Sequence, residues 1–307
     1  LFGAAFIAAF NENIVNVGLV DIMAEFDIGA PLAQWLVTGY MIVTTLVVSI
    51  VAFLQRRFSL RTLFFAACGV FLVGLLADLV APNYVLLLAF RLLQAIGTGI
   101  FVPVMMSTVL MLAPRNKVGT YLAIGSSCIT LGPALGPVAS GIAVTLFGWR
   151  SMFVLPLVGM LAVLAAGFFF VRPVAATQRI HLDIPSVALL AAGLTLLVYG
   201  LLVLTTQLVA ALAWLLFGMM ALAAFALRQG RLASPVLDLS PLRIPRFALA
   251  CVLVVVSMMT TFSLSVLLPL YFEGAHAQTA LVAGLLMLPP ILLNAGTAIV
   301  AGRILDK

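Results

Sequence analysis

The sequence predicts an all-α, polytopic membrane protein. Of its 307 residues, 65% are hydrophobic and only 8% are charged, whereas soluble globular domains carry about 25% charged residues. The apolar segments are continuous and roughly 20 residues long, as membrane-spanning helices require, and do not show the short alternating pattern of a barrel. Basic residues also recur in every second connection. We therefore expect a bundle of membrane-spanning helices.

Ten apolar segments are long enough to cross a bilayer. They cover residues 1–20, 32–54, 62–81, 84–112, 118–147, 150–171, 185–205, 208–227, 247–272 and 279–301.

The connections between these segments alternate in charge. Of the 15 Lys and Arg residues, all but Arg91 and Arg150 fall in the connections that follow the even-numbered segments. Because cytoplasmic loops carry an excess of Lys and Arg, we predict that this side faces the cytoplasm.

The polar connections also predict three parts of the chain. Residues 1–171 would form an N-terminal six-helix bundle, residues 172–246 an inserted two-helix linker with cytoplasmic loops, and residues 247–307 the first two helices of a second bundle. The strings IVAFLQRR (50–57) and IVAGRILDK (299–307) resemble each other, eight segments apart. Internal repeats of this kind are typical of secondary transporters.

The first apolar segment contains a polar string, FNENIVNV (10–17). On a helix Glu12, Asn13 and Asn16 share an arc roughly 100° wide, and Asn11 points elsewhere. An ionised carboxylate inside a bilayer costs roughly 3 kcal/mol, so this arc should face a cavity or another helix. The alternative is a hydrogen-bonded cluster that only holds helices together.

The fourth segment contains RLLQAIGTG (91–99), in which Arg91, Gln94 and Thr98 share a face. Arg91 lies ~10 Å from the extracellular start of its helix and Glu12 ~12 Å from the extracellular end of its own, at 1.5 Å per residue. We therefore predict a Glu12–Arg91 pair that acts as a proton switch, with a permanent structural ion pair as the alternative. Asp78, in the third segment, is a rival partner for Arg91.

The fifth segment contains GSSCITLGPALGPVASG (125–141), which places small residues along one helix face. Such a stripe lets another helix approach closely, and two internal prolines weaken the backbone hydrogen bonding. It predicts a hinge or a tight seam between moving halves, with plain close packing as the alternative. The candidate residues are Gly125, Gly132, Pro133, Gly136, Pro137 and Gly141.

Other polar and aromatic residues are candidates for lining a substrate cavity. They are Asn13, Asn16, Trp35, Tyr40, Gln94, Thr98 and Asn294. The sequence shows no nucleotide-binding glycine loop, no paired-carboxylate metal site and no Ser-His-Asp arrangement, so we expect no cofactor, no metal and no enzyme activity. The scattered basic residues do not indicate nucleic-acid binding.

These strings together resemble the major facilitator superfamily, and in particular the 14-helix drug:proton antiporters of the EmrB/QacA type. NENIVNVGLVDI (11–22) is similar to the family's first-helix signature, whose aspartate position is occupied by Asn11 here. RLLQAIGTG resembles the motif whose arginine is linked to proton transfer, and GPALGPVASG (132–141) is close to the antiporter motif. The cytoplasmic loop motif corresponds to Arg56, Arg57 and Arg61, and its second copy to Gly302 and Asp306.

The resemblance implies export of lipophilic, often cationic, small molecules by alternating access, driven by the proton gradient without a cofactor. Glu12, Arg91 and Asp78 would couple transport to protons. It also implies an inserted seventh and eighth helix, four further helices after Lys307, a monomer, and a place in a bacterial cytoplasmic membrane.

Other functions predict different sequence features. A transporter of the same fold could instead carry a specific metabolite or a lipid, in either direction. A membrane-embedded enzyme should show several converging acids or histidines, and a non-transporting receptor should show long loops or a soluble domain. Neither pattern occurs in this sequence.

Overall fold

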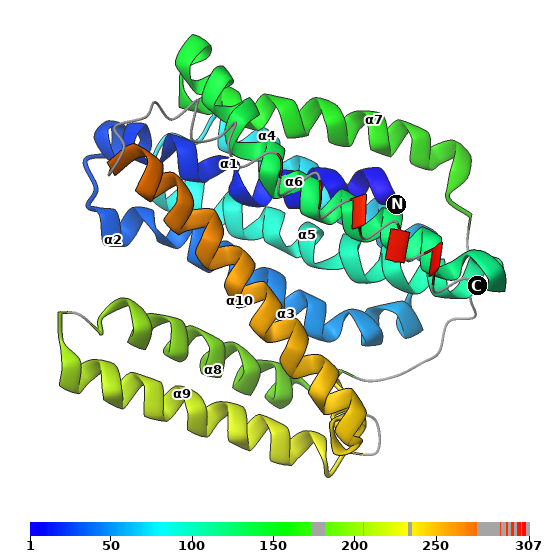
Figure 1. Cartoon of the computed structure of the whole chain (residues 1–307). Coiled ribbons are helices and arrows are strands. Elements are labelled where there is room, and N and C mark those ends of the chain that lie inside the picture. The colour runs from blue at the N-terminus through cyan, green and yellow to red at the C-terminus, as the bar shows by residue number, and fades with distance from the viewer. Residues whose placement is uncertain are drawn as a thin grey trace.

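In a computed structural model of the chain, the described residues are 1–172, 182–204, 206–232, 235–274 and eight separate positions between Pro289 and Ile304. Over these residues the secondary structure is helical, and no strand occurs among them. Eight helices in this part are long and apolar enough to cross a membrane. The all-α membrane fold is therefore confirmed (Figure 1).

The helices follow the predicted segments closely. Their bounds are α1 Phe2–Phe26, α2 Ala30–Ala33, α3 Trp35–Arg57, α4 Leu60–Leu79, α5 Tyr84–Leu112, α6 Val118–Phe147, α7 Val154–Phe170, α8 Ile184–Leu202, α9 Leu208–Gln229 and α10 Pro245–Gly274, with short 3₁₀ turns η1 Arg115–Lys117, η2 Trp149–Phe153 and η3 Ser240–Arg243. The tenth predicted segment, 279–301, lies mostly outside the described residues.

The first helix is longer than predicted. We expected it to end near residue 20, but α1 continues to Phe26 and ends where Asp27 adopts a left-handed conformation with φ of 48°. Asp21 and Glu25 are exposed on this last stretch, while Ile22 is fully buried. The charged side chains lower the mean hydropathy of this stretch, so the predicted segment ends too early. The helix continues because it needs apolar residues only on the side that packs against other helices.

The first six spanning helices form one bundle. Within it α1 packs along α6, α4 packs along α5, and α3 packs along α5. Aromatic side chains fill the space between α4 and α5, where the Phe101 ring lies 6.4 Å from Phe64 and 6.1 Å from Phe71. Edge-to-face contacts at such distances are favourable beyond the area that they bury.

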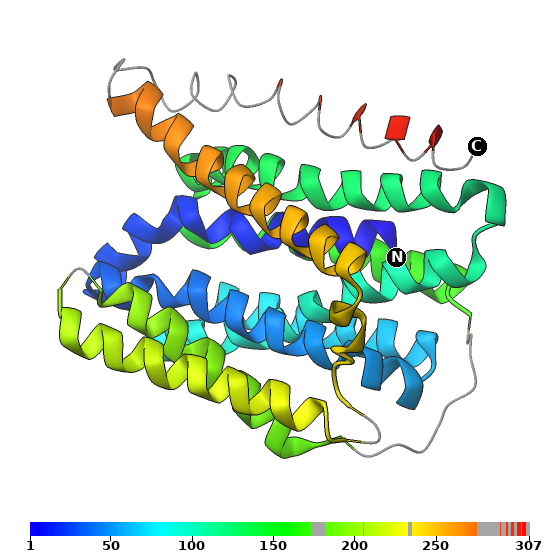
Figure 2. The same cartoon turned by 60° about the horizontal axis from the view of Figure 1, so that its bottom comes forward.

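The α8–α9 pair lies on the outside of this bundle, next to α3 (Figures 1 and 2). The two helices approach closely because glycines face the partner helix. A Cβ at Gly218 would lie 2.9 Å from the backbone nitrogen of Leu197, and one at Gly200 would lie 3.1 Å from that of Leu215. Small residues are the usual basis of close helix packing in membranes.

The last described helix, α10, packs mainly on η3 within the described residues. Most of its side chains from Phe247 to Met259 are exposed. The division of the chain at residues 171 and 246 stays a prediction.

Candidate functional site

A fully buried arginine occupies the centre of the first bundle. Arg91, on α5, has no exposed surface. Its Nη2 donates to the backbone carbonyl oxygens of Asn11, at 2.7 Å, and Glu12, at 3.1 Å. Its guanidinium carbon lies 4.1 Å from the centre of the Tyr40 ring. The cation is therefore held by helix α1 and by an aromatic face on α3.

Gln94, one turn further along α5, connects Arg91 to two other helices. Its Oε1 accepts from Arg91 Nη1 at 2.9 Å and from Asn11 Nδ2 at 2.8 Å. Its Nε2 donates to Oδ2 of Asp78 on α4. Asp78, Arg91 and Gln94 are all completely buried, so one neutral amide joins the carboxyl group of Asp78 to the guanidinium group of Arg91.

The hydroxyl of Tyr40 completes the cluster. It accepts from Asn11 Nδ2 at 3.3 Å and shares a hydrogen bond of 2.5 Å with Thr98 Oγ1. We call the six buried residues that make these contacts the polar network: Asn11, Tyr40, Asp78, Arg91, Gln94 and Thr98. Inside a bilayer no water is available to such groups, so they form hydrogen bonds mainly with one another.

Glycines bring the helices of the network together. A Cβ at Gly74, one turn before Asp78 on α4, would lie 2.5 Å from Gln94 Cγ and 2.9 Å from the Phe90 carbonyl oxygen. On α6, a Cβ at Gly132 would lie 2.7 Å from the backbone nitrogen of Phe10. The absence of a side chain at these positions therefore sets the distances from α4 to α5 and from α6 to α1.

The predicted Glu12–Arg91 ion pair is not formed. In the part of the chain that the structure describes, the side-chain ion pairs are Arg150–Glu25 and Arg228–Asp183. Arg91 approaches the side of α1 on which Asn11 lies, and the Glu12 side chain projects about 100° further around the helix. Arg91 therefore bonds to the carbonyl oxygen of Glu12 and not to its carboxylate. The two residues do lie at the same level, as predicted, although α1 ends six residues later than the residue from which the turns were counted.

Asn11 points away from Glu12, Asn13 and Asn16, as predicted, but it is Asn11 that is fully buried in the polar network. Glu12 and Asn13 are partly buried and Asn16 is exposed, so the arc that they form is not the side of α1 that packs on Arg91. The signal that could have identified Asn11 is its place in the first-helix signature, where it occupies the position of the family's aspartate.

Some of the residues predicted to line a substrate cavity lie inside the polar network and the others lie outside it. Tyr40, Gln94 and Thr98 belong to the polar network, where their hydrogen bonds are made to protein groups. Asn16 and Asn13 are bonded to each other at 3.4 Å outside it, and Trp35 is partly buried. Asn294 lies outside the described residues. A role in substrate binding stays a prediction for all of them.

The glycine stripe of α6 lies against α1. Besides Gly132, a Cβ at Gly136 would lie 2.9 Å from the Phe10 carbonyl oxygen, and one at Gly125 would lie 3.2 Å from Phe2 Cε1 of α1 and 2.9 Å from Met105 Cε of α5. The same atom at Gly141 would be 3.9 Å from its nearest neighbour. Neither Pro133 nor Pro137 ends the helix, which is continuous to Phe147. The close seam that the small residues predicted is present, and its service as a hinge stays a prediction.

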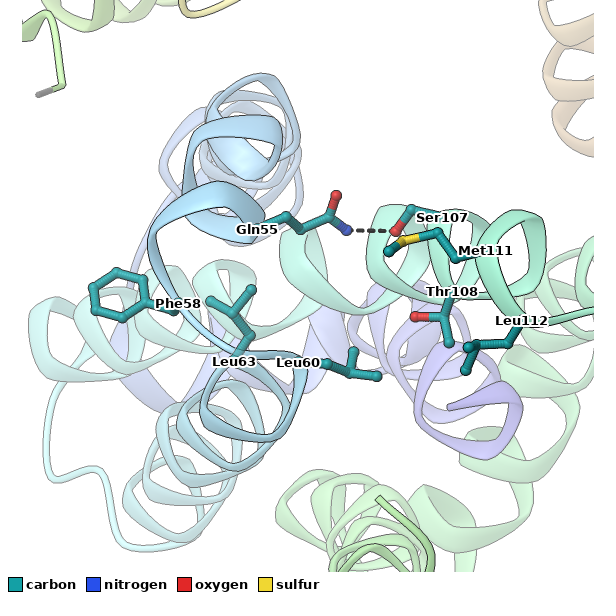
Figure 3. Close-up of a pocket in the computed structure, with 8 residues that line it drawn as sticks. All are labelled: Gln55, Phe58, Leu60, Leu63, Ser107, Thr108, Met111 and Leu112. Carbon is teal, nitrogen blue, oxygen red and sulfur yellow. Dashed lines mark hydrogen bonds between the residues drawn. The ribbon is translucent and has the colours of Figure 1, made fainter. Parts of the chain in front are cut away.

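The basic loop candidates lie at the predicted cytoplasmic ends of α3 and α4. Arg56, Arg57 and Arg61 are exposed there, and their counterparts Gly302 and Asp306 lie outside the described residues. A small pocket of about 50 Å³ opens between the ends of α3, α4 and α5, with a hydrogen bond of 2.6 Å from Gln55 Nε2 to Ser107 Oγ in its wall (Figure 3). Its lining residues are those labelled in Figure 3, and none of them belongs to the polar network.

Arg150, one of the two exceptions to the charge pattern, is explained by a contact that the sequence did not indicate. Its Nη1 lies 2.6 Å from Oε1 of Glu25, and its Nη2 donates to the Ala81 carbonyl oxygen at 3.1 Å. Trp149 Nε1 also donates to Glu25, at 2.6 Å. These contacts join the end of α1 to the α4–α5 connection and to η2, at the predicted outer face.

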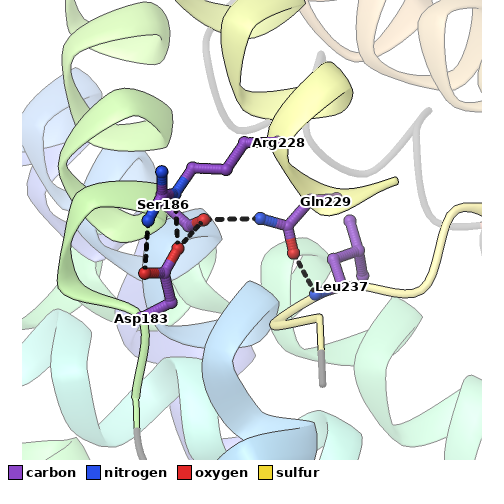
Figure 4. Close-up of polar contacts among 5 residues, drawn as sticks. All are labelled: Asp183, Ser186, Arg228, Gln229 and Leu237. Atoms are coloured by element: carbon purple, nitrogen blue, oxygen red, sulfur yellow. Dashed lines mark hydrogen bonds and ion pairs between the residues drawn. The ribbon is translucent and has the colours of Figure 1, made fainter. Parts of the chain in front are cut away.

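A second polar cluster joins the α8–α9 pair at its predicted cytoplasmic end (Figure 4). Arg228 donates to both carboxylate oxygens of Asp183, at 2.7 and 2.9 Å. Gln229 Nε2 donates to Ser186 Oγ at 2.6 Å, and its Oε1 accepts from the backbone N–H of Leu237 at 3.1 Å. The hydrogen bonds from Arg228 and Ser186 hold the pKa of the Asp183 carboxyl well below its ordinary value of 3.8.

Together, the apolar helices and the buried polar network between them define an integral membrane protein. The family model described as Major Facilitator Superfamily matches residues 1–307, and the chain belongs to this family.

Relatives are found along the full chain. The chain is 33% identical over 319 residues to the Uncharacterized MFS-type transporter YhcA of Bacillus subtilis (strain 168), covering 100% of the chain and 58% of the relative. It is 31% identical over 317 residues to the Lincomycin resistance protein LmrB of the same organism, covering 99% and 64%. It is 28% identical over 306 residues to the Riboflavin transporter RibZ of Clostridioides difficile (strain 630), covering 98% and 66%.

The chain thus spans about three-fifths of the length of these relatives. The family and the names of its members indicate a transporter and not an enzyme. With bacterial relatives and eight apolar helices in its described part, it is a multi-pass protein of the cytoplasmic membrane.

Proposed function

We propose that the protein to which this chain belongs is a proton-coupled secondary transporter that exports hydrophobic or amphipathic small molecules by alternating access. We also propose that it is of the 14-helix EmrB/QacA type, with α8 and α9 as the inserted pair. The observation that carries this proposal is the completely buried Arg91, bonded to the backbone of α1 at Asn11 and Glu12.

The geometry supports a role of Glu12 in proton coupling. Arg91 Nη2 lies 3.1 Å from the Glu12 carbonyl oxygen, which fixes a positive charge next to this residue. An ionised Glu12 is attracted by that charge and a protonated one is not, so proton binding changes the force between α1 and α5. A carboxyl group that binds a proton from one side of the membrane and releases it to the other can drive export, provided that the group is exposed to the two sides in turn.

Two observations support a lipophilic substrate. Outside the network, the buried polar residues in the described part of the first bundle are Ser127 and Ser140 of α6, so a cavity next to α1 would offer few fixed hydrogen-bonding partners. A relative carries the printed name of a lincomycin resistance protein. The one acid beside such a cavity would favour cationic compounds.

A second candidate is a transporter of the same fold for a specific metabolite. The relative named as a riboflavin transporter favours it. The two candidates differ in selectivity: an exporter of many drugs should protect cells from several unrelated lipophilic compounds, whereas a specific transporter should move one compound and ignore the rest.

The coupling is tested by Glu12→Gln in everted membrane vesicles of the full-length protein, with efflux of lincomycin, riboflavin and a panel of cationic dyes driven by an imposed pH gradient. We expect this variant to insert normally and to lose gradient-driven efflux, because the amide cannot carry the proton. Glu25→Gln is the matched control, since it makes the same change on the same helix at the outer cluster. Undiminished pumping by Glu12→Gln would remove Glu12 from the mechanism.

A further inference from the structure

The side-chain amide of Gln94 has its oxygen next to hydrogen-bond donors and its nitrogen next to an acceptor. Its Oε1 lies toward two donors, Arg91 Nη1 at 2.9 Å and Asn11 Nδ2 at 2.8 Å. Its Nε2 donates to Asp78 Oδ2. An amide oxygen only accepts and an amide nitrogen only donates, so the reverse orientation would set an NH₂ group against two donors and an oxygen against a carboxylate. The ionised form of Asp78 therefore selects the orientation of Gln94.

We propose that Gln94 is a positioning residue that transmits the protonation state of Asp78 to helix α1 through Arg91 and Asn11. The inference deepens the proposed proton-coupled function and rests on it for its physiological meaning. A proton that binds to the Asp78 carboxylate turns an acceptor into an O–H donor. The Gln94 amide can then rotate, so that its oxygen accepts from Asp78 and leaves Arg91 and Asn11.

The network already holds the groups that the second arrangement needs. Among the described residues, three of its buried atoms have no hydrogen-bond partner: Asn11 Oδ1, Asp78 Oδ1 and Arg91 Nε. Asp78 Oδ1 is an open position for a proton, and a half-turn of the carboxyl group about its Cβ–Cγ bond brings that O–H to face Gln94. Asn11 Oδ1 is then an acceptor for the NH₂ group of the rotated Gln94. Buried groups without partners are costly, which keeps the first arrangement from being much more stable than the second.

The rotation has a direct consequence for α1. Arg91 holds the carbonyl oxygens of Asn11 and Glu12 while its other amino group is anchored on Gln94. Without that anchor the guanidinium is free to turn on the Tyr40 ring, and its two bonds to α1 change with it. The helix that carries Glu12 therefore responds to a proton bound on α4.

The charged groups around Asp78 are few. Arg91 of α5 faces it, with Tyr40 of α3 and Glu12 of α1 beyond the guanidinium. Helix α7, which also packs on α4, has no titratable residue. On η2, Arg150 reaches the Ala81 carbonyl oxygen just beyond α4, but it is paired with Glu25. Asp78 is thus the acid whose ionisation alters the Gln94 contacts.

The test follows α1 directly. In the full-length protein without native cysteines and with Glu12→Gln, which removes the titration of Glu12 from the signal, a spin label on Asn16→Cys, an exposed position one turn beyond residue 12, reports the mobility of α1 by electron paramagnetic resonance. The protein is held in nanodiscs without substrate or gradient, and the spectrum is recorded from about pH 5 to 9, where buried carboxyls titrate. We expect a change in mobility with a single midpoint.

Two variants remove the relay at different points. Gln94→Met keeps the length of the side chain without its amide and is expected to abolish the pH response, and Asp78→Asn is expected to abolish it too. Gln55→Met is the matched control: it makes the same substitution and breaks a bond between α3 and α5, but it lies far from the network. It should retain the full response.

A conservative variant guards against simple misfolding. Gln94→Glu still offers an oxygen to Arg91 and can share a proton with Asp78, so the response should return with its midpoint shifted by about one pH unit or more. An unchanged response in Gln94→Met, or no pH response in the parent protein, would overturn the relay. If transport proves independent of protons while the response still requires Gln94, the proposed function fails and the relay stands. If transport is proton-coupled and Gln94→Met responds normally, the relay alone fails.

Discussion

At the scale of single residues, Arg91 shows how a charge is kept inside an apolar bundle. It has no exposed surface, yet two of its nitrogens make hydrogen bonds, and its plane lies on the Tyr40 ring. Lysine could not reproduce this arrangement, because it lacks both the planar fork and the stacking surface. Asp78, also buried, supplies the opposite charge through Gln94.

This pairing predicts non-additive effects on stability. Arg91→Met and Asp78→Asn should each destabilise the bundle, since each leaves the other charge uncompensated. The double variant should be more stable than the sum of the two effects predicts, with a coupling energy of about 0.5–3 kcal/mol. Unfolding in mixed micelles measures all four proteins. Strictly additive values would show that the two charges do not interact through Gln94.

Glu25 and Arg150 are the contrasting case at the same scale. Their ion pair is short, at 2.6 Å, but their side chains are 40% and 35% exposed. Exposed pairs of this kind contribute about 0–1 kcal/mol. We therefore expect Glu25→Gln to lower the midpoint of thermal unfolding only slightly, and a large loss of stability would mean that the outer cluster is more important than its exposure indicates.

At the scale of helices, the contact of α1 with α6 depends on glycines. Gly132 and Gly136 lie against the backbone of Phe10, next to the first residue of the polar network. The register of these two helices therefore determines where Asn11 and Glu12 lie.

Two substitutions in α6 should have opposite outcomes. Gly132→Ala places a methyl group 2.7 Å from the Phe10 nitrogen, so the helices must separate, at a cost of about 1–3 kcal/mol. Gly141→Ala, nine positions along the same helix, has 3.9 Å to its nearest neighbour and should be neutral or stabilising by up to about 1 kcal/mol, the helix propensity of alanine over glycine. Thermal unfolding in detergent compares them. Equal effects would contradict a close seam at Gly132.

At the scale of the whole molecule, the Asp183 cluster ties the α8–α9 pair to the connection that leads to α10. Its contacts run from Asp183 through Ser186 and Gln229 to the backbone of Leu237. Because the folded protein depresses the pKa of Asp183, the contribution of this carboxylate is fully present above its ordinary value of 3.8 and is lost only as the pH falls toward the lower folded value.

This cluster predicts local protection of the connection. In Asp183→Ala, the Leu237 amide should exchange its hydrogen severalfold faster at neutral pH, because the side chains that position Gln229 lose their anchor. In the unaltered protein, after correction for the intrinsic rate, protection should be constant from about pH 5 to 8, since Asp183 is ionised throughout. Exchange followed by mass spectrometry measures both. Unchanged exchange in the variant would show that Gln229 is held by other contacts.

How far the sequence predicts the fold is clear from the eight described spanning helices, whose bounds agree with the apolar segments within a few residues except at the end of α1. Membrane helices are predictable because each must satisfy its own backbone hydrogen bonds, so length and hydropathy suffice to find them. The site was predicted less well. Arg91, Gln94 and Thr98 were placed on one face correctly, but Arg91 was paired with the Glu12 carboxylate, and Asn11 was left out of the cluster.

The sequence by itself determined the class of protein, the eight described spanning segments and the level at which Arg91 meets α1, while the side that faces the cytoplasm stays a prediction. These depend on composition and on distances along one helix. Only the tertiary structure decided which groups bind one another: Asn11 in place of Glu12, Asp78 reached through Gln94, and Glu25 paired with Arg150. Those choices depend on how helices are rotated against each other, and this rotation is set by contacts such as that of Gly132 with Phe10, between residues far apart in the chain.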